Sequence, residues 1–219
     1  QLDVDLTTLI NEKKKGNYFA GTLKTQEGEE IAVEVRARGK FRRIRCDMPP
    51  LKLKFSKKSL RSMGLDTLNE VKLVVPCFDD PGSEAGLLRE YAAYKIYEQL
   101  AAPYAVRARL IRLTIRDNHV EKMYRPVWCM LTEHSEEVSA RLKGSMIERY
   151  NLPSDSLVTE SAALNAVFQY AIGNTDWDIE GFRNVYLFQP ADGGKLIPIP
   201  YDFDFSGLSM VVNSDCTAR

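Results

Sequence analysis

Three polar motifs are the most specific feature of this sequence: Gly-Asn-Thr-Asp at residues 173–176, Arg-Asn-Val-Tyr-Leu at residues 183–187, and Pro-Tyr-Asp-Phe-Asp at residues 200–204. The first comes after an apolar helical pattern, and the other two lie at the two ends of a predicted β-hairpin. The first and last residues of an antiparallel hairpin lie next to each other. We therefore expect the polar residues of the second and third motifs to meet near the loop that carries the first.

Hydrophobic periodicity predicts the elements around these motifs. A helix precedes residue 173, and its apolar stripe consists of Leu164, Val167, Phe168, Ala171 and Ile172. Gly173 ends this helix, since glycine readily adopts the left-handed conformation found just after helices. Strands are predicted over residues 184–189 and 195–199, joined by a turn at the Asp-Gly-Gly of residues 192–194.

Predicted strands dominate the sequence before residue 133. They share an alternation of apolar and charged residues or a short apolar run, and they cover residues 18–24, 31–35, 51–55, 71–75, 106–110, 111–115 and 125–132. The apolar parity changes after residue 110, which predicts a β-bulge there. Residues 85–100 instead have the four-residue spacing of an amphipathic helix. We expect a sheet-rich lobe over residues 1–132 and a second lobe over residues 133–219.

The composition is that of a folded protein without a strong overall charge. Of 219 residues, 44% are hydrophobic, and 30 basic residues balance 30 acidic ones. Such a chain has no general positive field for nucleic acid or an anionic membrane, so any phosphate binding must be local. No apolar run approaches the roughly 20 residues of a membrane-spanning helix. Because Gln1 is not an initiator Met, we expect that any residues before it were removed by processing or cloning; the sequence leaves open whether the natural protein continues beyond Arg219.

Four cysteines, at positions 46, 77, 129 and 216, have no C-x-x-C spacing. Only His119 and His134 could complete a zinc site with them, so a structural zinc is not expected. Three complete disulfide pairings are conceivable. In a chain of this length the pattern favours buried thiols over disulfides.

The order of the polar residues suits phosphoryl transfer. That reaction needs metal ions held against the phosphates and a carboxylate aimed at the attacking hydroxyl. Asp176 lies on the loop after the helix, Asn184 at the entrance of the hairpin and Asp202 just beyond its exit. Asn and Asp side chains supply the hard oxygen atoms that Mg²⁺ prefers.

These motifs are similar to the signatures of the spore coat protein H (CotH) kinase-like family, which read N-x-D, then N-x-Y-L, then P-W-D-x-D. The resemblance implies an α+β, two-lobed, divergent protein-kinase-like fold with a smaller helical C-lobe that holds a metal-binding hairpin. It also implies transfer of phosphate from ATP, with Mg²⁺, to hydroxyl groups of a protein substrate. Asp176 and Asp202 would be catalytic, Asp176 near the base position, and Asn184 and Asp202 would bind the metal with help from Asp204.

A looser resemblance lies upstream. Residues 36–39 and 50–55 are similar to the R-x-R-G motif and the K-P-x-x-x-K-F strand of the same family. The resemblance implies that Arg38 and Lys54 contact the nucleotide, with Glu90 as the ion-pair partner of Lys54. Lys52 points to the same side of its strand as Lys54, so either lysine could face solvent or nucleotide.

The chain also departs from the kinase pattern. Tyr201 replaces the usual Trp, and the step from Asp176 to Asn184 is eight residues, longer than in the H-R-D-x-x-x-x-N loop. No H-R-D, G-x-G-x-x-G or Walker motif is present, so the basic residues of segment 36–45 would have to cover the phosphates, unless they meet an acidic partner instead.

Other classes of function make different demands on the sequence. The acidic run from residue 174 is not an EF-hand, because Ile179 and Val185 occupy the positions that need Gly and Glu. No nucleophile motif supports a hydrolase. An inactive kinase-like scaffold of a cell envelope or coat, and a nucleotide sensor, stay open as alternatives. The resemblance alone suggests a location outside the cytoplasm.

Overall fold

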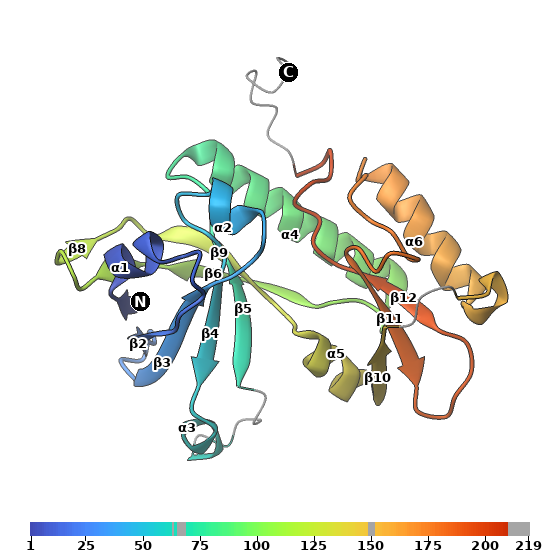
Figure 1. Cartoon of the computed structure of the whole chain (residues 1–219), viewed down its shortest axis with the longest axis horizontal. Coiled ribbons are helices and arrows are strands. Elements are labelled where there is room, and N and C mark those ends of the chain that lie inside the picture. Colours follow the sequence, from blue (N-terminus) through green and yellow to red (C-terminus); the bar gives the residue numbers. More distant parts are fainter. Residues whose placement is uncertain (63, 65–68, 149–151, 210–219) are drawn as a thin grey trace. The chain divides into compact units, whose positions relative to one another are not determined.

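The computed structural model describes residues 1–62, 64, 69–148 and 152–209 and has the α+β architecture expected from the sequence (Figure 1). The chain divides into two compact units. Gln1–Leu87 and Arg109–Thr132 form the first, and Leu88–Ala108 joins the chain from Glu133 onward in the second. Helix α4 (Pro81–Ala101) therefore contributes residues to both units.

A mixed sheet is the centre of the first unit. Within the described residues its strand order is β6-β9-β5-β4-β3-β2-β1-β7-β8. The strands are β1 (Leu2–Val4), β2 (Phe19–Lys24), β3 (Glu30–Ala37), β4 (Leu51–Phe55), β5 (Glu70–Val74), β6 (Ala108–Leu113), β7 (Ile115–Asp117), β8 (Lys122–Met123) and β9 (Val127–Thr132). Three short helices lie between strands: α1 (Leu6–Asn11), α2 (Arg42–Arg45) and α3 (Lys57–Ser62).

Strands β3 and β4 show why the alternating pattern was a good guide. Val33 and Val35 are buried, and Leu53, which pairs with Val35, is buried on the same face. The charged residues between them point the other way, where Glu34 and Lys54 are directly opposite and form a 2.9 Å ion pair. Burial of alternate apolar side chains fixes the register, because a shift by one residue would expose all of them.

The N-terminal strand and helix were not predicted, because each is too short to show a period. Strand β1 runs parallel to β7, with Leu2 opposite Ile115. Asp117, at the end of β7, is fully buried and its carboxylate accepts hydrogen bonds from the N–H groups of Leu6 and Thr7. A carboxylate at the start of helix α1 satisfies N–H groups that have no partner within the helix.

Helix α4 begins at Pro81, four residues before the predicted start. Asp80 precedes it, and its carboxylate accepts the N–H of Ser83 at 2.9 Å. One turn on, Glu84 accepts the backbone N–H of Trp128 in β9 at 2.8 Å and pairs with Arg125 at 3.0 Å. The Trp128 N–H, with Arg125, lowers the pKa of Glu84 despite its partial burial. The first turn of α4 is thereby tied to the sheet.

The second unit combines a small sheet with two helices of its own. The sheet order is β10-β11-β12, all antiparallel. Its elements are α5 (Ser135–Leu142), β10 (Gly144–Ile147), a 3-10 turn η1 (Ser154–Ser156), α6 (Thr159–Ala171), β11 (Val185–Pro190) and β12 (Ile197–Pro200). The hairpin β11–β12 is confirmed, although β12 starts two residues later than predicted. Strand β10 was not predicted.

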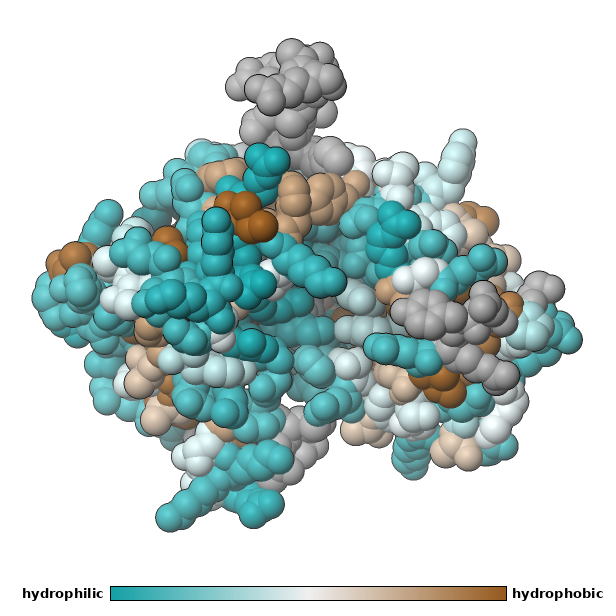
Figure 2. Space-filling view, in the orientation of Figure 1, coloured by the Kyte–Doolittle hydropathy of each residue, from teal (hydrophilic) through white to brown (hydrophobic). Residues whose placement is uncertain are grey.

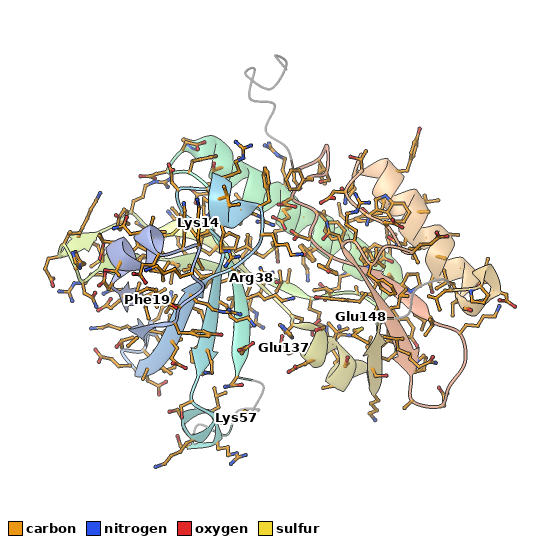
Figure 3. All side chains as sticks on the ribbon, viewed as in Figure 1. Lys14, Phe19, Arg38, Lys57, Glu137 and Glu148 are labelled. Atoms are coloured by element: carbon orange, nitrogen blue, oxygen red, sulfur yellow. A yellow bond between two sulfur atoms is a disulfide. The ribbon has the colours of Figure 1, made fainter. Side chains whose placement is uncertain are left out.

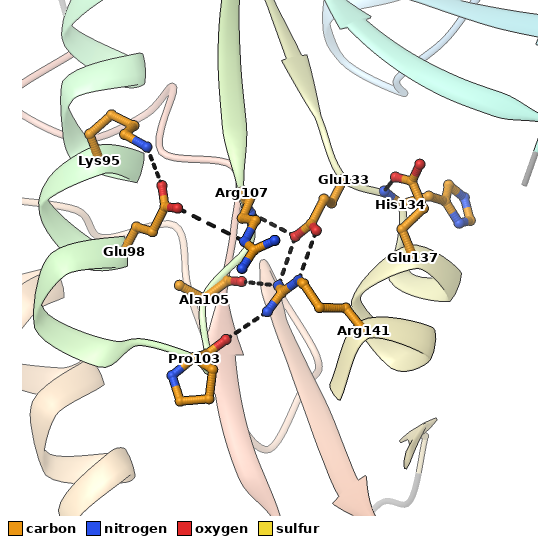
Figure 4. Close-up of polar contacts among 9 residues, drawn as sticks. All are labelled: Lys95, Glu98, Pro103, Ala105, Arg107, Glu133, His134, Glu137 and Arg141. Atoms are coloured by element: carbon orange, nitrogen blue, oxygen red, sulfur yellow. Dashed lines mark hydrogen bonds and ion pairs between the residues drawn. The ribbon is translucent and has the colours of Figure 1, made fainter. Parts of the chain in front are cut away.

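A well-shielded ion pair connects α5 to the chain just beyond α4 (Figure 4). Arg141 forms a salt bridge with Glu133 at 2.8 Å, and its remaining N–H groups donate to the carbonyls of Pro103 at 2.8 Å and Ala105 at 2.6 Å. The carboxylate of Glu133 also accepts the backbone N–H of Arg107 at 2.8 Å. A guanidinium that satisfies several acceptors in one plane holds these two segments in a defined geometry.

The cysteines differ from the expectation of buried thiols. Cys46 and Cys77 form a disulfide across 31 residues of sequence, which corrects that expectation for both. Sequence spacing could not show this pairing, because it depends on the loop after α2 meeting the chain after β5 in space. Cys129 is a free and buried thiol, as expected, and burial raises its pKa to about 12. Cys216 lies outside the described residues.

We predict that replacing both Cys46 and Cys77 with Ser lowers the free energy of unfolding by about 2–4 kcal/mol, because a disulfide restricts the unfolded chain. Urea denaturation followed by circular dichroism checks this. Dithiothreitol should lower the stability of the natural protein to that of the variant and leave the variant unchanged. Equal stability of the two proteins without reductant would contradict the prediction.

Candidate functional site

The hairpin β11–β12 brings the second and third motifs together, as the sequence predicts. Val185 is paired with Pro200, and the adjoining residues are connected by a hydrogen bond of 2.9 Å from the N–H of Tyr201 to the carbonyl of Asn184. The rings of Tyr186 and Tyr201 stack with their centroids 4.0 Å apart. Asn184 and Asp202 therefore lie at the same end of the hairpin.

Asn184 also contacts the first motif directly. Its side-chain Nδ2 donates to the backbone carbonyl of Asp176 at 2.8 Å and to the carboxylate Oδ2 of the same residue at 3.0 Å. Both contacts are to acceptors, which sets the orientation of the amide group. The amide nitrogen of Asn184 is therefore committed to Asp176, and its Oδ1 is the atom left for another ligand.

The backbone at this end of the hairpin requires unusual residues. Asn184 has a φ of 54° and Asp202 a φ of 61°, both in the left-handed region. Asn and Asp tolerate this conformation better than other residues with a side chain. Their presence therefore has a structural cause. Such conformations cluster at functional sites, where the surrounding fold holds them in place.

Helix α4 fixes the backbone of Asp202. The N–H of Asp202 donates to the hydroxyl oxygen of the buried Tyr94 at 2.8 Å. The next residue, Phe203, is fully buried and packs edge-on against Tyr94 and Phe168, with ring centroids 4.8 and 5.5 Å apart. Burial, together with the weaker effect of the Glu90 and Asp202 charges, raises the pKa of Tyr94 well above its usual value. Tyr94 thus stays a neutral phenol that anchors Asp202.

Two polar residues to which the sequence analysis assigned no role, Asn174 and Gln169, hold the loop of Asp176. Asn174 is buried and its Oδ1 accepts the N–H of Asp176 at 3.0 Å. Its Nδ2 donates at 2.9 Å to Gln169, which is fully buried in α6. The N–H of Asn174 in turn donates to the Gln169 carbonyl at 2.9 Å. Side chains of Gln169 and Asn174 therefore position the backbone that presents Asp176.

The buried face of α6 differs from the predicted stripe. Phe168 and Ile172 are buried as expected, but Val167 is 66% exposed. Asn165 and Gln169 are instead fully buried. Gln169 has a physical reason to be buried, because its side chain accepts the Asn174 amide and so supports the polar loop. Neither polar side-chain atom of Asn165 has a hydrogen-bond partner among the described residues, and the structure offers no physical reason for its burial. A period that counts only apolar residues assigns such polar positions to solvent.

The loop between Asp176 and Asn184 is closed by its own backbone. Asp178 and Arg183 exchange two N–H to carbonyl hydrogen bonds, each 2.9 Å long. The Arg183 guanidinium lies 3.7 Å from Asp176 Oδ1 and 3.8 Å from Asp178 Oδ2. In the described part of the chain, no three His, Cys, Asp or Glu side chains gather into a metal-binding group. The predicted metal ligands are Asn184, Asp202 and Asp204, a set that differs from such a group because it includes an amide side chain.

The two upstream residues predicted to contact the nucleotide, Lys54 and Arg38, belong to the first unit. Lys54, in the first unit, pairs with Glu34, and this hydrogen bond raises the pKa of Lys54. Lys52 on the same face pairs with Glu70. Arg38, also in the first unit, is half-buried and its backbone N–H donates to the Pro50 carbonyl at 2.8 Å.

Glu90 and Asp204 belong to the second unit with the three motifs. Glu90 is buried on α4, one turn before Tyr94. Its charge contributes to the raised pKa of Tyr94, as does that of Asp202, so the two acids act on the same phenol. Asp204 is half-buried beyond Phe203. The structure thus brings Asp176 and Asn184 into contact and holds Asp202 through the same hairpin and through α4.

A separate pocket of about 350 Å³ lies in the first unit. Apolar side chains of α1 and of the chain near the disulfide, such as Leu6, Ile10 and Phe78, form much of its lining. It includes Asp117, whose carboxylate is occupied by α1. No predicted site residue lines it. We therefore assign the candidate site to the hairpin end and not to this pocket.

We predict that Tyr94→Phe lowers the free energy of unfolding by about 1–3 kcal/mol, because the N–H of Asp202 loses its acceptor. Tyr97→Phe is the matched control: Tyr97 is equally buried on α4 and packs its ring on Phe168. Chemical denaturation of both variants measures the difference. The prediction is wrong if the two substitutions cost the same.

Asn174→Ala is expected to loosen the loop of Asp176, since it removes the acceptor of the Asp176 N–H and the donor to Gln169. Amide hydrogen exchange should become at least about tenfold faster at Asp176, which corresponds to loss of roughly 1.4 kcal/mol of protection. Exchange in the first unit should not change. Unaltered exchange at Asp176 would show that Asn174 does not hold the loop.

Comparison with known proteins does not assign the chain to a family. No model of a protein family matches the chain, and no curated protein matches it in sequence. The resemblance to CotH-like kinases therefore depends on the motifs themselves, and what it implies is a proposal.

Proposed function

We propose that this protein transfers the γ-phosphoryl group of ATP to hydroxyl groups of a protein, with Mg²⁺, at a site made by Asp176, Asn184 and Asp202. One observation carries this proposal: the Asn184 amide is bound to Asp176 while the paired strand delivers Asp202 at the same hairpin end. Asn184 and Asp176 are thus in contact, and the backbone that carries Asp202 is paired at the same hairpin end. A positioned carboxylate beside metal ligands is what phosphoryl transfer requires.

Asp176 would act as the base toward the attacking hydroxyl. Its Oδ2 accepts the Asn184 amide at 3.0 Å, and its side chain is 36% exposed, so a substrate hydroxyl can reach it. The hydrogen bond fixes the carboxylate orientation, which matters because general base catalysis requires hydrogen-bond distance to the proton that is removed. Asn174 and Gln169 would keep this carboxylate in position.

The donor atoms of Asn184 and Asp202 fit a magnesium ion. Mg²⁺ binds hard oxygen atoms, and in phosphotransferases it is held by one or two side chains together with substrate phosphates and water. Asn184 offers its Oδ1, since its nitrogen is committed to Asp176. Asp202 adds a carboxylate on a backbone held by Tyr94, and Asp204 would assist. The ion would neutralise charge on the transferred phosphate.

The kinase-like, two-lobed arrangement forms part of the proposal. As the family resemblance implies, Arg38 and Lys54 would contact the nucleotide phosphates, and Glu90 would be the ion-pair partner of Lys54. Lys54 would have to exchange its present partner Glu34, an ion pair of 2.9 Å between half-exposed groups. Such pairs contribute little free energy, typically about 0–1 kcal/mol, so phosphate can displace Glu34.

The same ion pair favours a second candidate function. If Lys54 keeps Glu34 as its partner, the chain is a kinase-like scaffold, or a sensor that binds nucleotide without transferring phosphate. This alternative retains the hairpin and its hydrogen bonds for structural reasons. The two candidates differ in turnover, so separate measurements of binding and phosphate transfer distinguish them.

We predict that Asp176→Asn retains binding of ATP with Mg²⁺ but lowers the rate of phosphorylation by about 10²–10⁴-fold, the usual contribution of a general base. Asp202→Asn should instead abolish Mg²⁺-dependent ATP binding, because a metal ligand loses its charge. Isothermal titration measures binding, and transfer of labelled phosphate to a hydroxyl-containing protein measures turnover. Asp192→Asn, in the exposed hairpin turn, is the control and should change neither.

The outcomes separate the candidates. ATP binding that depends on Asp202 without any phosphoprotein product would identify a sensor. The absence of any heat change with ATP and Mg²⁺ in the natural protein would reject the nucleotide site and leave the scaffold.

A further inference from the structure

The first unit carries a local concentration of positive charge that the balanced composition hides. Residues 36–45 contain six Lys or Arg residues and no acidic residue, although the whole chain has 30 of each sign. Three further lysines occupy residues 13–15, directly after α1. Figure 3 labels Lys14 and Arg38, which belong to these two segments.

The fold brings the two basic segments side by side. Lys13 Nζ donates to the carbonyl of Cys46 at 2.7 Å, just beyond α2. Gly16 faces the opposite segment, because a Cβ at this position would lie 3.5 Å from Arg43 Nη1 and 3.9 Å from Arg36 Nη1. Positive side chains from the segment after α1, from β3 and from α2 therefore share one surface, although like charges repel one another.

Large apolar side chains lie exposed within this positive surface. Phe41 is 52% exposed and Ile44 is 61% exposed, on either side of the Arg42-Arg43 pair at the start of α2. Figure 2 shows hydrophobic surface bordered by hydrophilic surface at the position that α2 has in Figure 1. We call this set of exposed and half-exposed residues the basic-apolar patch; it consists of Lys14, Lys40, Phe41, Arg43, Ile44 and Arg45.

We propose that the basic-apolar patch binds the surface of an anionic lipid bilayer. Lys and Arg side chains are attracted to anionic head groups, and Phe and Ile can enter the boundary between head groups and acyl chains. Nucleic acid would use the charges but gain little from Ile44, since an aliphatic side chain cannot stack on a base as an aromatic ring does. The combination of charge with an exposed aliphatic side chain therefore favours lipid.

This proposal does not depend on the nucleotide site. The patch shares no residue with the proposed nucleotide site. Arg38 and Lys54 are also in the first unit but are not part of the patch, and Asp176, Asn184 and Asp202 belong to the second unit. It concerns attachment to a membrane surface and not passage through it: none of the described helices is long and apolar enough to span a bilayer. Membrane attachment would place the enzyme or scaffold near substrates at that surface.

Co-sedimentation of the whole chain with vesicles tests the proposal. The protein should bind vesicles of phosphatidylcholine mixed with phosphatidylserine and not vesicles of phosphatidylcholine alone. Binding should weaken as the salt concentration is raised, because dissolved ions screen the attraction between the basic side chains and the anionic head groups. Phe41→Ser with Ile44→Ser, and separately Arg43→Glu with Arg45→Glu, should each weaken partition into the anionic vesicles by at least about tenfold.

Matched controls isolate the patch from general effects. Val120→Ser with Met123→Ser removes two side chains that are 54% and 53% exposed near β8, and should leave binding unchanged. Lys57→Glu with Lys58→Glu reverses two exposed charges on α3 and should also have little effect. Circular dichroism confirms that each variant is folded.

Specific results would overturn the proposal. One is the absence of binding to the anionic vesicles; another is equal binding by the Phe41/Ile44 variant and the natural protein. Fluorescence anisotropy with a labelled single-stranded oligonucleotide provides the competing arm. Tight oligonucleotide binding that persists in the Phe41/Ile44 variant, with no vesicle binding, would assign the patch to nucleic acid instead.

Discussion

The hydrogen bonds from the Asn184 side chain to Asp176 are the interaction on which the candidate site depends. They connect the loop after α6 to the entrance of the β11–β12 hairpin. Without them, Asp176 would belong to a surface loop and Asn184 to a strand end, with no reason to act together. The side-chain amide has one donor group, Nδ2, and one acceptor atom, Oδ1. Because Nδ2 donates to Asp176, Oδ1 is the atom that remains for a cation. One side chain thus fixes the carboxylate geometry and, in the proposed function, would offer its Oδ1 to the metal.

The surrounding elements hold this pair in place from two sides. Gln169 and Asn174 fix the loop through buried hydrogen bonds, while Tyr94 and Phe203 fix the backbone of Asp202 through an N–H acceptor and an aromatic cluster. Buried hydrogen bonds are costly to break, because each lost partner leaves a desolvated polar group. Rigid support of this kind is what a site needs when catalysis depends on positioning.

Strong periodic patterns in the sequence predicted the main elements of the fold, and local chemistry predicted the contact of Asp176 with Asn184. The β3–β4 alternation, helix α4 and the β11–β12 hairpin each have many residues that repeat one signal. Short elements such as β1 and β10 have too few residues for a period. The polar face of α6 and the Cys46–Cys77 disulfide depend on which distant segments meet, and a single sequence contains no direct record of that. The run of basic residues over 36–45 was visible in the sequence, but its contact with residues 13–16 and the exposure of Phe41 and Ile44 depend on the fold.

The central claim is that Asn184 and Asp202 share one divalent cation beside Asp176. Paramagnetic broadening by Mn²⁺, added with ATP in place of Mg²⁺, tests this claim most directly, because it reports distance from the ion residue by residue. We expect the nuclear magnetic resonance signals of the Asn184 side-chain amide and of the Asp202 backbone to broaden first, while those of Asp192 stay sharp. Broadening confined to other surfaces, or none at all, would contradict the claim.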